Sequence, residues 1–361
     1  MRILVAGAGP AGLYFSYLAK RQHPDWQFRV VEQNRADSTF GFGVVFSDRA
    51  LEFLREDDPA TYELITPRME IWTDLKVVHR GTAVVIDGIG FAAIGRLELL
   101  RLLQRQAASV GVVPEYEKAI SGEEIQDYDL VVAADGVNSV VRTWHDFGTT
   151  VSHLRNKFAW YGTTTVFDTL TQTFVANEHG TFNAHHYRHS PRMSTFVVEC
   201  DAETWRRAGF AAMSETATLA YLEKVFGHPL VSNKSVWRNF PNLRNRRWFV
   251  GNTALIGDAL RTAHFSIGSG TRLAMEDAIV LAKALSEHSG LEAALAAFEA
   301  ARRPVVEKLV AAADASGAWY ERFPEHMKLE PREFAWSYIQ RSGRIDPARL
   351  RKISPKFVDG R

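Results

Sequence analysis

The sequence predicts an α/β fold with an inserted, mainly β domain and a set of C-terminal helices. Three observations lead to this prediction. The motif GAGPAG at residues 7–12 directly follows an apolar run, and the motif LIGD at residues 255–258 precedes the Gly-rich segment 268–271. Between the two motifs, residues 157–200 alternate polar and apolar side chains and are rich in Thr, Val, Phe and Tyr, which is typical of strands.

The first motif has the pattern of a Rossmann-like βαβ unit. An expected strand at residues 2–6 precedes it, and apolar residues at helical spacing follow it over residues 10–20. In such a turn the first Gly allows a tight bend, the second lets the backbone approach a pyrophosphate, and the third allows close packing of helix on strand. We therefore predict that the pyrophosphate of a dinucleotide is bound by Gly7, Gly9, Ala11 and Gly12.

An acidic residue ends the second expected strand. Glu32 follows residues 27–31, about 20 positions beyond the turn, where a carboxylate can bond the hydroxyls of an adenosine ribose. An Arg at this position would suit a 2′-phosphate. Glu32 therefore favours FAD over a 2′-phosphorylated dinucleotide as the bound cofactor.

The second motif extends the predicted site to the flavin end of FAD. It follows an apolar stretch, and the Gly-rich segment after it starts a helical pattern. The amides and the dipole at such a helix start can stabilise negative charge on a reduced flavin ring. The alternative is that these glycines only shape a turn. We predict contacts to FAD from Gly257, Asp258, Gly268, Gly270 and Thr271.

Two further segments between the motifs provide candidate cofactor contacts. Arg96 stands at the start of an expected helix that runs to about residue 109, although a cation is mildly unfavourable at a helix N-terminus. Asp135 follows the expected buried strand 129–134. For Asp135, a phosphate-binding turn and a plain strand-to-helix turn are equally good interpretations.

The segments between and after these motifs define the expected domains. An FAD-binding domain with its C-terminal helix is expected at residues 1–66, 91–147 and 246–325, a substrate-binding β-sheet domain at residues 67–90 and 148–245, and a C-terminal tail at residues 326–361. Residues 190–192 predict a hairpin turn, Pro304 predicts a break in the last long helix, and residues 341–361 predict a loosely ordered end.

Composition narrows the class of protein. The chain has 43 Lys and Arg residues against 42 Asp and Glu residues, so we expect neither nucleic acid nor an anionic membrane surface as a partner. No apolar run reaches the roughly 18 residues of a membrane span. The N-terminus enters a strand without a signal peptide, and the single Cys200 excludes an internal disulfide. These features predict a cytoplasmic enzyme, and both a monomer and a homodimer stay open.

Histidines and arginines outside the motifs are candidates for contacts with a substrate. His185 and His186 are neighbours on an expected strand, so their side chains face opposite sides and cannot share a metal ion. We therefore expect no metal site, and we name His264 and His186 as candidate proton carriers. The phosphates of coenzyme A or of a nicotinamide cofactor could meet Arg238, Arg244 and Arg246, with a solvated basic loop as the alternative.

The order of these motifs resembles that of the class A flavin monooxygenases, the single-component aromatic hydroxylases of the p-hydroxybenzoate hydroxylase type. The resemblance spans nearly the whole chain. Within that family, residues 41–48, 90–96 and 264–271 resemble the salicylyl-CoA 5-hydroxylases and the monooxygenase half of 2-aminobenzoyl-CoA monooxygenase/reductase, whereas residues 155–163 and 193–200 resemble the violacein-pathway indole hydroxylase. Two departures are noted. Residues around His264 and Phe265 replace the Pro that usually follows the GD motif of the wider family, as they do in the close relatives, and we expect the reductase domain of the 2-aminobenzoyl-CoA enzyme to be absent, because the sequence ends at Arg361.

The resemblance implies an FAD-dependent hydroxylase. FAD would bind non-covalently, NADH or NADPH would reduce it, and the reduced flavin would add O2 as a C4a-hydroperoxide that transfers oxygen to an electron-rich aromatic ring. An aryl-CoA thioester such as salicylyl-CoA or 2-aminobenzoyl-CoA is the expected substrate, with Phe265 near its ring. The open alternatives are an indole or other fused-ring intermediate, and a flavin reductase that hydroxylates nothing.

Overall fold

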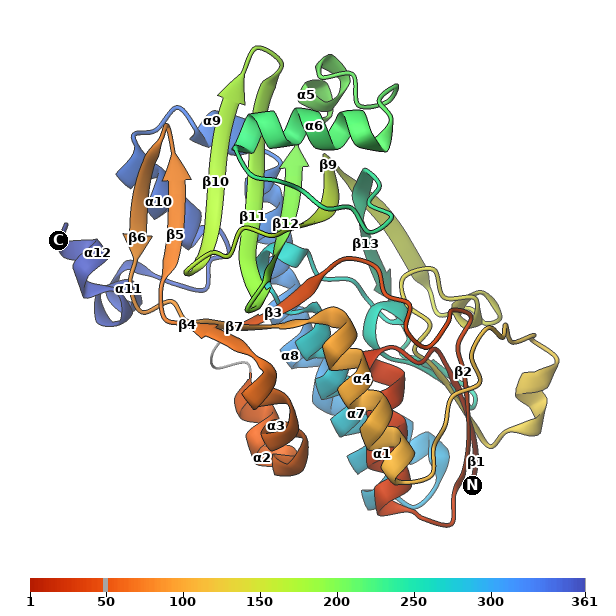
Figure 1. Cartoon of the computed structure of the whole chain (residues 1–361). Helices are drawn as coiled ribbons and strands as arrows, with labels where there is room; N and C mark the ends of the chain where they lie inside the picture. Colours follow the sequence, from red (N-terminus) through yellow and green to blue (C-terminus); the bar gives the residue numbers. More distant parts are fainter. Residues whose placement is uncertain (48–50, 361) are drawn as a thin grey trace.

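The structure is a computed structural model that describes residues 1–47 and 51–360. Figure 1 shows a lower lobe built on one sheet, an upper lobe built on a larger sheet, and C-terminal helices against one edge of the upper lobe. Asp48, which ends the motif at residues 41–48, lies outside the described residues.

The lower lobe contains a five-stranded sheet in the order β14–β15–β8–β1–β2. Strands β1 (Arg2–Ala6), β2 (Gln27–Val31), β8 (Leu130–Ala133) and β15 (Thr253–Leu255) are parallel, and β14 (Phe249–Val250) runs antiparallel to β15. The helices of this lobe are α1 (Pro10–Gln22), α4 (Arg96–Ser109), α7 (Gly270–Glu287) and α8 (Leu291–Tyr320). Helix α1 packs against both α4 and α7, which places the starts of these helices close together.

The first βαβ unit lies where the sequence predicted it. Strand β1 is buried from Ile3 onwards, as expected for a strand inside a parallel sheet covered by helices. Helix α1 begins with Pro10, where a missing N–H removes no intrahelical bond. The α/β fold with a Rossmann-like unit is therefore confirmed.

The upper lobe contains a seven-stranded sheet in the order β13–β9–β12–β11–β10–β5–β6. All neighbours are antiparallel except β10 and β5, which are parallel. The strands are β5 (Leu75–His79), β6 (Thr82–Ile86), β9 (Thr149–Thr163), β10 (Leu170–Asn177), β11 (Gly180–Ser190), β12 (Met193–Cys200) and β13 (Arg238–Asn245). The predicted hairpin turn at residues 190–192 is confirmed between β11 and β12.

Two helices cover one face of the large sheet. These are α5 (Ala202–Arg207) and α6 (Glu215–Phe226), drawn above the sheet in Figure 1. A hydrophobic core lies between them and the strands, and it includes Phe182, Phe196 and Leu222. Successive strand residues point to opposite faces of a sheet. The face of β11 and β12 that α5 and α6 do not cover is therefore turned towards the rest of the molecule.

A three-stranded antiparallel sheet joins the two lobes. It consists of β3 (Gly43–Ser47), β7 (Phe91–Gly95) and β4 (Glu70–Trp72), with β7 in the middle. Strands β3 and β7 both contact β11 of the large sheet, and α4 continues directly from β7. The short helices α2 (Glu52–Asp57) and α3 (Pro59–Ile65) extend from this sheet beside the lower lobe.

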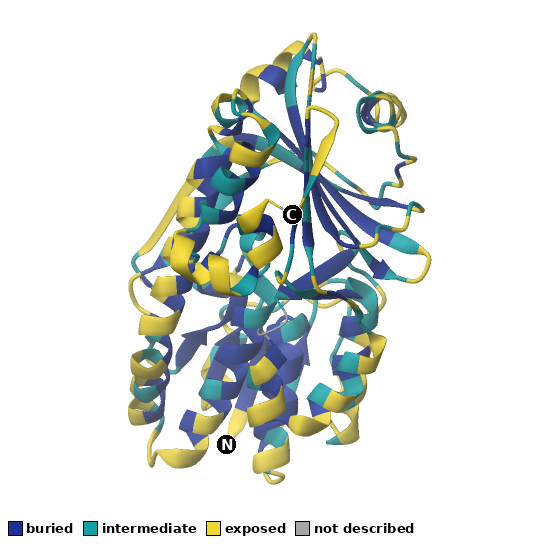
Figure 2. Cartoon of the chain, turned by 90° about the vertical axis from the view of Figure 1, so that its left-hand side faces the viewer, coloured by how far each residue is buried: buried dark blue, intermediate teal, exposed yellow. Residues whose placement is uncertain are grey.

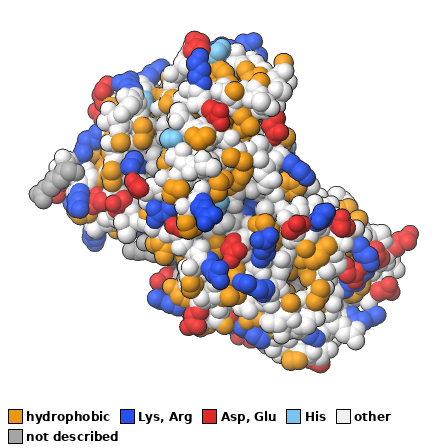
Figure 3. Space-filling view, in the orientation of Figure 1, with side chains coloured by type: hydrophobic (Ala, Val, Ile, Leu, Met, Phe, Trp, Pro, Cys, Tyr) orange, Lys and Arg blue, Asp and Glu red, His pale blue; other side chains and the backbone are white. Residues whose placement is uncertain are grey.

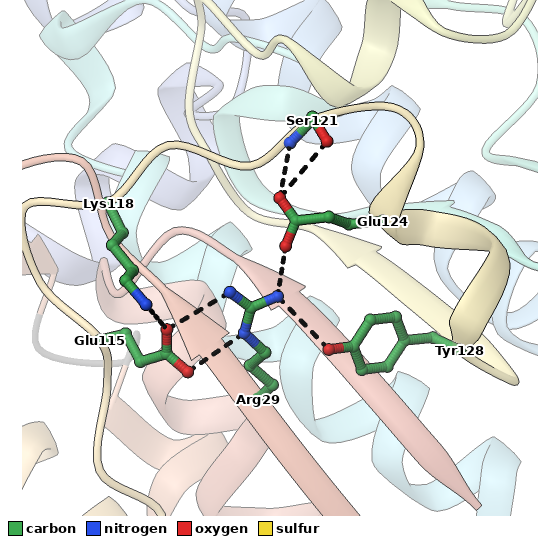
Figure 4. Close-up of polar contacts among 6 residues, drawn as sticks. All are labelled: Arg29, Glu115, Lys118, Ser121, Glu124 and Tyr128. Carbon is green, nitrogen blue, oxygen red and sulfur yellow. Dashed lines mark hydrogen bonds and ion pairs between the residues drawn. The ribbon is translucent and has the colours of Figure 1, made fainter.

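An ion-pair cluster fixes the loop beside the end of β2 (Figure 4). The Arg29 guanidinium donates to Glu115 at 3.1 Å and to Glu124 at 2.5 Å, and Lys118 donates to Glu115 at 2.8 Å. These hydrogen bonds, those from Arg29 first, lower the pKa of the Glu115 and Glu124 carboxyl groups. Because the amide of Glu32 donates to the Glu115 carbonyl at 2.9 Å, the cluster also fixes the backbone of Glu32.

The C-terminal region differs from two sequence-based expectations. Helix α8 continues through Pro304, where the sequence predicted a break, because buried side chains before and after the proline hold both halves against the core. The end of the chain is also not loosely ordered. It forms α9 (Phe323–His326), α10 (Pro331–Gln340), α11 (Pro347–Ile353) and α12 (Pro355–Asp359), and the side chains of Leu350 and Phe357 are buried.

A hydrophobic core joins these C-terminal helices to the upper lobe. Its members include Leu75 and Val77 of β5 together with Phe334 of α10 and Phe357 of α12. Figure 2 shows the same helices with exposed outer and buried inner surfaces. The chain end therefore forms a wall of the molecule.

Candidate active site

A cavity of about 290 Å³ lies where the two lobes meet. Its lower wall comes from the turn between β1 and α1 (Gly9, Pro10 and Ala11), from Arg96 at the start of α4, and from the start of α7. Further lining residues from the second motif are Gly257, Asp258, Gly268, Ser269, Gly270 and Thr271. The structure therefore brings the two distant Gly-rich motifs to one site.

A second cavity of about 140 Å³ continues this site towards β2. It shares Gly9, Pro10 and Arg96 with the first cavity and is also lined by Glu32. The Glu32 carboxylate accepts hydrogen bonds from the amide of Ala8 at 3.0 Å and from the amide of Asn34 at 2.8 Å. Glu32 is thereby fixed at the far end of one long groove that reaches Asp258.

The glycines of the first turn fit a bound dinucleotide. A Cβ on Gly12 would lie 2.0 Å from the Gly7 carbonyl oxygen, and a Cβ on Gly7 would lie 2.4 Å from that of Ala134. A Cβ on Gly9 would meet nothing within 4 Å. Gly7 and Gly12 are therefore required by close packing, whereas Gly9 leaves open the space that a pyrophosphate would occupy.

Arg96 provides the positive charge at the middle of the groove. Its amide donates to the Phe42 carbonyl at 2.8 Å, and its half-buried side chain lines both cavities. Burial lowers the pKa of Arg96, while the nearby Asp258 carboxylate acts in the opposite direction. A diphosphate between Gly9 and Arg96 would compensate the charge of this guanidinium.

A buried ion cluster fixes the turn that carries Asp258. The Asp277 carboxylate pairs with Arg261 at 2.6 Å and with Arg302 at 3.1 Å, and it accepts a hydrogen bond from the amide of Gly257 at 3.0 Å. No motif of the sequence predicted this role. The position of Asp277, seven residues after the start of a helix with mostly apolar positions, could have indicated a buried ion pair. An acidic side chain in such a place is rarely left unpaired.

Asp135 does not line the groove. Its carboxylate accepts hydrogen bonds from the amide of Val140 at 2.8 Å and from that of Val141 at 3.4 Å, so it holds the turn after β8 together. Its neighbour Gly136 lines the first cavity instead. The other carboxylate oxygen of Asp135 is buried without a partner among the described residues, so both interpretations of Asp135 stay open.

The upper wall of the first cavity is aromatic. It is formed by side chains from the large sheet and from the loop before α7, namely Trp160, His185, Tyr187, Phe240 and Phe265. Phe265 lies 6.4 Å from Trp160 and 6.0 Å from Phe240, measured between ring centroids. This wall stands opposite the start of α7, so a flat ring could be held between the two.

His185 and not His186 faces this cavity. Neither ring nitrogen of His185 has a hydrogen-bond partner among the residues that the structure describes. Burial lowers the pKa of His185 to about 3, with Arg341 contributing further, so the imidazole is neutral. His186 points to the opposite face, where it stacks on Phe196 and bonds Thr173 at 2.9 Å, and it is withdrawn as a candidate proton carrier.

His264 lies behind the aromatic wall. Its Nδ1 is 2.7 Å from the Ser266 hydroxyl, which in turn is 2.7 Å from the Ser316 hydroxyl. Burial lowers the pKa of His264 to about 3. His264 therefore positions the loop that carries Phe265 and does not itself line the cavity.

The three arginines expected to meet phosphates lie elsewhere. Arg244 pairs with Asp314 at 2.6 Å and donates to the Thr262 carbonyl, while Arg238 and Arg246 are exposed on and just after β13. None of them lines the cavities described above. Their sequence-based assignment to a cationic mouth is not supported.

Within residues 1–47 and 51–360, no group of three or more His, Cys, Asp or Glu side chains is arranged to hold a metal ion. None of the helices in that part of the chain is both long enough and apolar enough to span a membrane. Figure 3 shows Lys and Arg side chains interspersed with Asp and Glu over one face of the molecule.

Comparisons with known proteins agree with this geometry. The FAD binding domain family matches residues 97–313. Salicyloyl-CoA 5-hydroxylase of a Streptomyces species is 43% identical over 99% of this chain and 73% of its own length. Protodeoxyviolaceinate monooxygenase of Chromobacterium violaceum is 38% identical over 96% of each chain. A 3-hydroxy-4-methyl-anthranilyl-(aryl-carrier protein) 5-monooxygenase of Streptosporangium sibiricum is 36% identical over 90% of each.

Solved structures share the fold. The tetrameric form of 2-methyl-3-hydroxypyridine-5-carboxylic acid oxygenase superposes with a TM-score of 0.75 at 19% identity, over 98% of this chain and 95% of that one. The family match, the three relatives and the long groove all agree. The chain therefore belongs to the FAD-binding family of class A flavin monooxygenases, and its cofactor is FAD.

Proposed function

We propose that this monooxygenase hydroxylates an electron-rich ring carried by an aryl-CoA thioester, with NADH or NADPH as the reductant and O2 as the oxygen source. The observation that carries the proposal is the aromatic cavity opposite the start of α7. Two of the relatives are named for aryl thioesters, one of coenzyme A and one of a carrier protein. An activating hydroxyl or amino group on the ring would make the reacting carbon electron-rich.

The long groove provides the contacts that FAD needs. The backbone at Gly9 and the Arg96 guanidinium would hold the pyrophosphate, and Glu32 would bond the adenosine ribose. Asp258 would bond the ribityl chain, and the N-terminal amides of α7 would stabilise negative charge on the reduced ring. When bound, FAD supplies the redox chemistry and the activation of O2.

The residues of this chain would position the substrate ring and exclude water. Trp160, Phe240 and Phe265 can hold the ring in near-attack geometry and keep solvent from the reacting atoms. His185 is neutral and has a free nitrogen lone pair within the same wall. It can accept a hydrogen bond from an activating hydroxyl group and so orient the ring for attack.

A second candidate function is hydroxylation of an indole or another fused ring. The aromatic wall of the cavity favours it, because Trp160 and Phe265 offer extended faces for stacking. The relative of Chromobacterium violaceum adds support, since its match covers almost the whole chain. The two candidates differ in whether a thioester is required.

The test measures how each compound accelerates flavin reduction by NADH or NADPH, followed by the product mass in air. The panel is salicylyl-CoA, 2-aminobenzoyl-CoA, the two free acids and indole compounds. We expect a thioester, but not its free acid, to accelerate reduction and to gain one oxygen atom. Hydroxylation of an indole compound alone would replace the first candidate by the second. A product that gains two hydrogens and no oxygen would indicate a reductase.

A further inference from the structure

A third cavity, of about 210 Å³, lies next to the proposed ring site. The two cavities share the lining residues Val45, His185 and Gly268. The other walls of the third cavity come from residues 88–91, from Leu75 and Leu170 of the large sheet, from the start of α7 and the loop before it, and from the C-terminal residues 338–353. The chain end that was expected to be loosely ordered therefore closes a space beside the reacting ring.

Four arginines line this third cavity. Two of them, Arg341 and Arg272, bond to acceptor groups near the cavity walls. Arg341 donates to the carbonyls of Ser266 and Tyr338, each at 2.8 Å, and its guanidinium lies 3.8 Å from the centre of the Tyr338 ring. Arg272 pairs with Glu276 at 2.7 Å. These two arginines support the walls of the cavity.

The other two arginines, Arg344 and Arg349, stand exposed at its mouth. Burial by its surroundings lowers the pKa of Arg344, and the positive charges of Arg272 and Arg349 lower it further. One guanidinium nitrogen of Arg349 donates to the Arg344 carbonyl at 3.2 Å, but within residues 1–47 and 51–360 neither side chain has a carboxylate at ion-pair distance. Like charges gathered at one mouth repel one another, so an anion that bridged them would be bound favourably.

The interior behind this mouth is largely apolar. It is lined by Leu75, Ile89, Phe91, Leu170, Ile339, Ile345 and Ile353. A ligand that fits has phosphate at one end, a slender uncharged arm and a group that reaches the ring site. Guanidinium groups recognise phosphate oxygens with paired hydrogen bonds, and an arm within such walls excludes water.

We infer that the third cavity binds the phosphopantetheine arm of the thioester, with Arg344 and Arg349 on its phosphates. The inference rests on the proposed function and adds to it the place where the carrier of the aryl group is bound. The arginines assigned to the phosphates are therefore Arg344 and Arg349, which line a cavity, and no longer Arg238, Arg244 and Arg246. Coenzyme A and a carrier protein share this arm, and they differ in the number of phosphates.

The test compares the wild type with the double variant Arg344→Gln, Arg349→Gln. Substrates are salicylyl-CoA, salicylyl-4′-phosphopantetheine and the N-acetylcysteamine thioester, which has no phosphate. We expect KM for salicylyl-CoA to rise roughly 10–100-fold, as for lost charge-assisted hydrogen bonds, with kcat retained. KM for the N-acetylcysteamine thioester should stay unchanged. Arg351→Gln is the matched control, because Arg351 is an exposed residue of α11 that does not line the cavity.

The substrate salicylyl-4′-phosphopantetheine distinguishes coenzyme A from a carrier protein as the source of the arm. An equal rise in KM for salicylyl-4′-phosphopantetheine and for salicylyl-CoA indicates that the site binds a single phosphate group, as is present on a carrier protein. A rise for salicylyl-CoA alone indicates the diphosphate of coenzyme A. No change for either compound, or an equal change for the N-acetylcysteamine thioester, overturns the inference.

A binding measurement keeps the inference separate from the proposed function. Calorimetric titration of the holoenzyme with coenzyme A needs no turnover, and we expect the double variant to bind it at least tenfold more weakly than the wild type or Arg351→Gln. Equal binding by all three proteins would overturn the site even if a thioester is hydroxylated. If no thioester is hydroxylated but this difference is found, the proposed function fails and the phosphate site stands.

Discussion

At the scale of single residues, β11 illustrates what sequence can and cannot assign. The alternation of a strand predicts that His185 and His186 face opposite sides, and the structure agrees. The alternation alone does not predict which of the two histidines faces the cavity, because the answer depends on which element covers each face of the sheet. Here α6 and its core cover the face of His186, so His185 is left at the ring site.

His185 and His186 therefore form a matched pair for mutation. We predict that His185→Gln lowers the rate of hydroxylation about 10-fold, as expected when a hydrogen bond of about 1.4 kcal/mol that orients the ring is lost. His186→Gln, on the opposite face, should retain the rate. The measurement is the rate of product formation at saturating substrate. Equal rates in His185→Gln and in the wild type would exclude a hydrogen bond from the substrate to His185.

The buried histidines also predict a pH dependence of stability. The pKa of His185 is about 3 in the folded protein, against an ordinary value of 6.5. Between these values the unfolded chain binds a proton that the folded protein does not, so stability falls as pH falls, by up to about 1.4 kcal/mol per pH unit.

Urea unfolding of the wild type and of His185→Gln at pH 7 and pH 5 checks this dependence. The free energy of unfolding of the wild type should decline more between the two pH values. His264 titrates in the same direction but is present in both proteins, so its contribution cancels. Parallel declines would show that His185 is not held neutral by burial.

Asp258 tests the cofactor groove. If its carboxylate bonds the ribityl chain, Asp258→Ala should weaken FAD binding by about 1–3 kcal/mol, which is the contribution of a charge-assisted contact. Glu32→Ala should weaken it less, because Glu32 would touch only the ribose. Titration of the apoprotein with FAD, followed by flavin fluorescence, measures both. A folded Asp258→Ala variant with wild-type affinity would remove Asp258 from the site.

At the scale of elements, local motifs are predictable and long-range packing is not. The strand, turn and helix around the first motif follow from neighbouring residues, so β1 and α1 lie where the sequence predicted them. A break at Pro304 also follows from a local rule. It is overridden because the side chains of Phe298 and Val306, one on each side of the proline, are buried in the same core.

An acidic residue in a loop of the upper lobe caps the last helix of the C-terminal wall. The Asp87 carboxylate accepts a hydrogen bond from the amide of Phe357 at 2.8 Å, and its carbonyl accepts one from the Ser354 hydroxyl at 2.5 Å. We predict that Asp87→Ala costs about 1 kcal/mol of stability, as for a lost helix cap, and speeds proteolysis within residues 347–360.

Limited proteolysis with mass analysis of the fragments measures this effect. Asp359→Ala is the control, because Asp359 is an exposed residue near the end of α12. Equal cleavage rates in Asp87→Ala and in the wild type would mean that hydrophobic packing alone holds the wall.

At the scale of the whole molecule, the two parts of the site differ in how far they could be predicted. The cofactor groove is built from strand ends and helix starts, and each carries a recognisable motif, so most of its residues could be named in advance. The third cavity is built from β3, β7, α7 and the end of the chain. No local pattern links those segments, and only the folded chain brings Arg344 and Val45 into the lining of one cavity.

The expected domain boundaries stay a prediction. The segment at residues 67–90 was expected to join the substrate-binding sheet, and β5 and β6 do so. Strand β4 pairs with β7 in the small sheet instead. Pairing of this kind depends on long-range register, which composition does not reveal.

The central claim is that this chain transfers one oxygen atom from O2 to the ring of an aryl thioester. The most direct measurement is a turnover of salicylyl-CoA with NADH or NADPH under isotopically labelled O2, followed by mass analysis of the thioester and of hydrogen peroxide. We predict a thioester that carries one labelled oxygen, with little labelled peroxide. An unchanged thioester, with all of the label in peroxide, would contradict the claim.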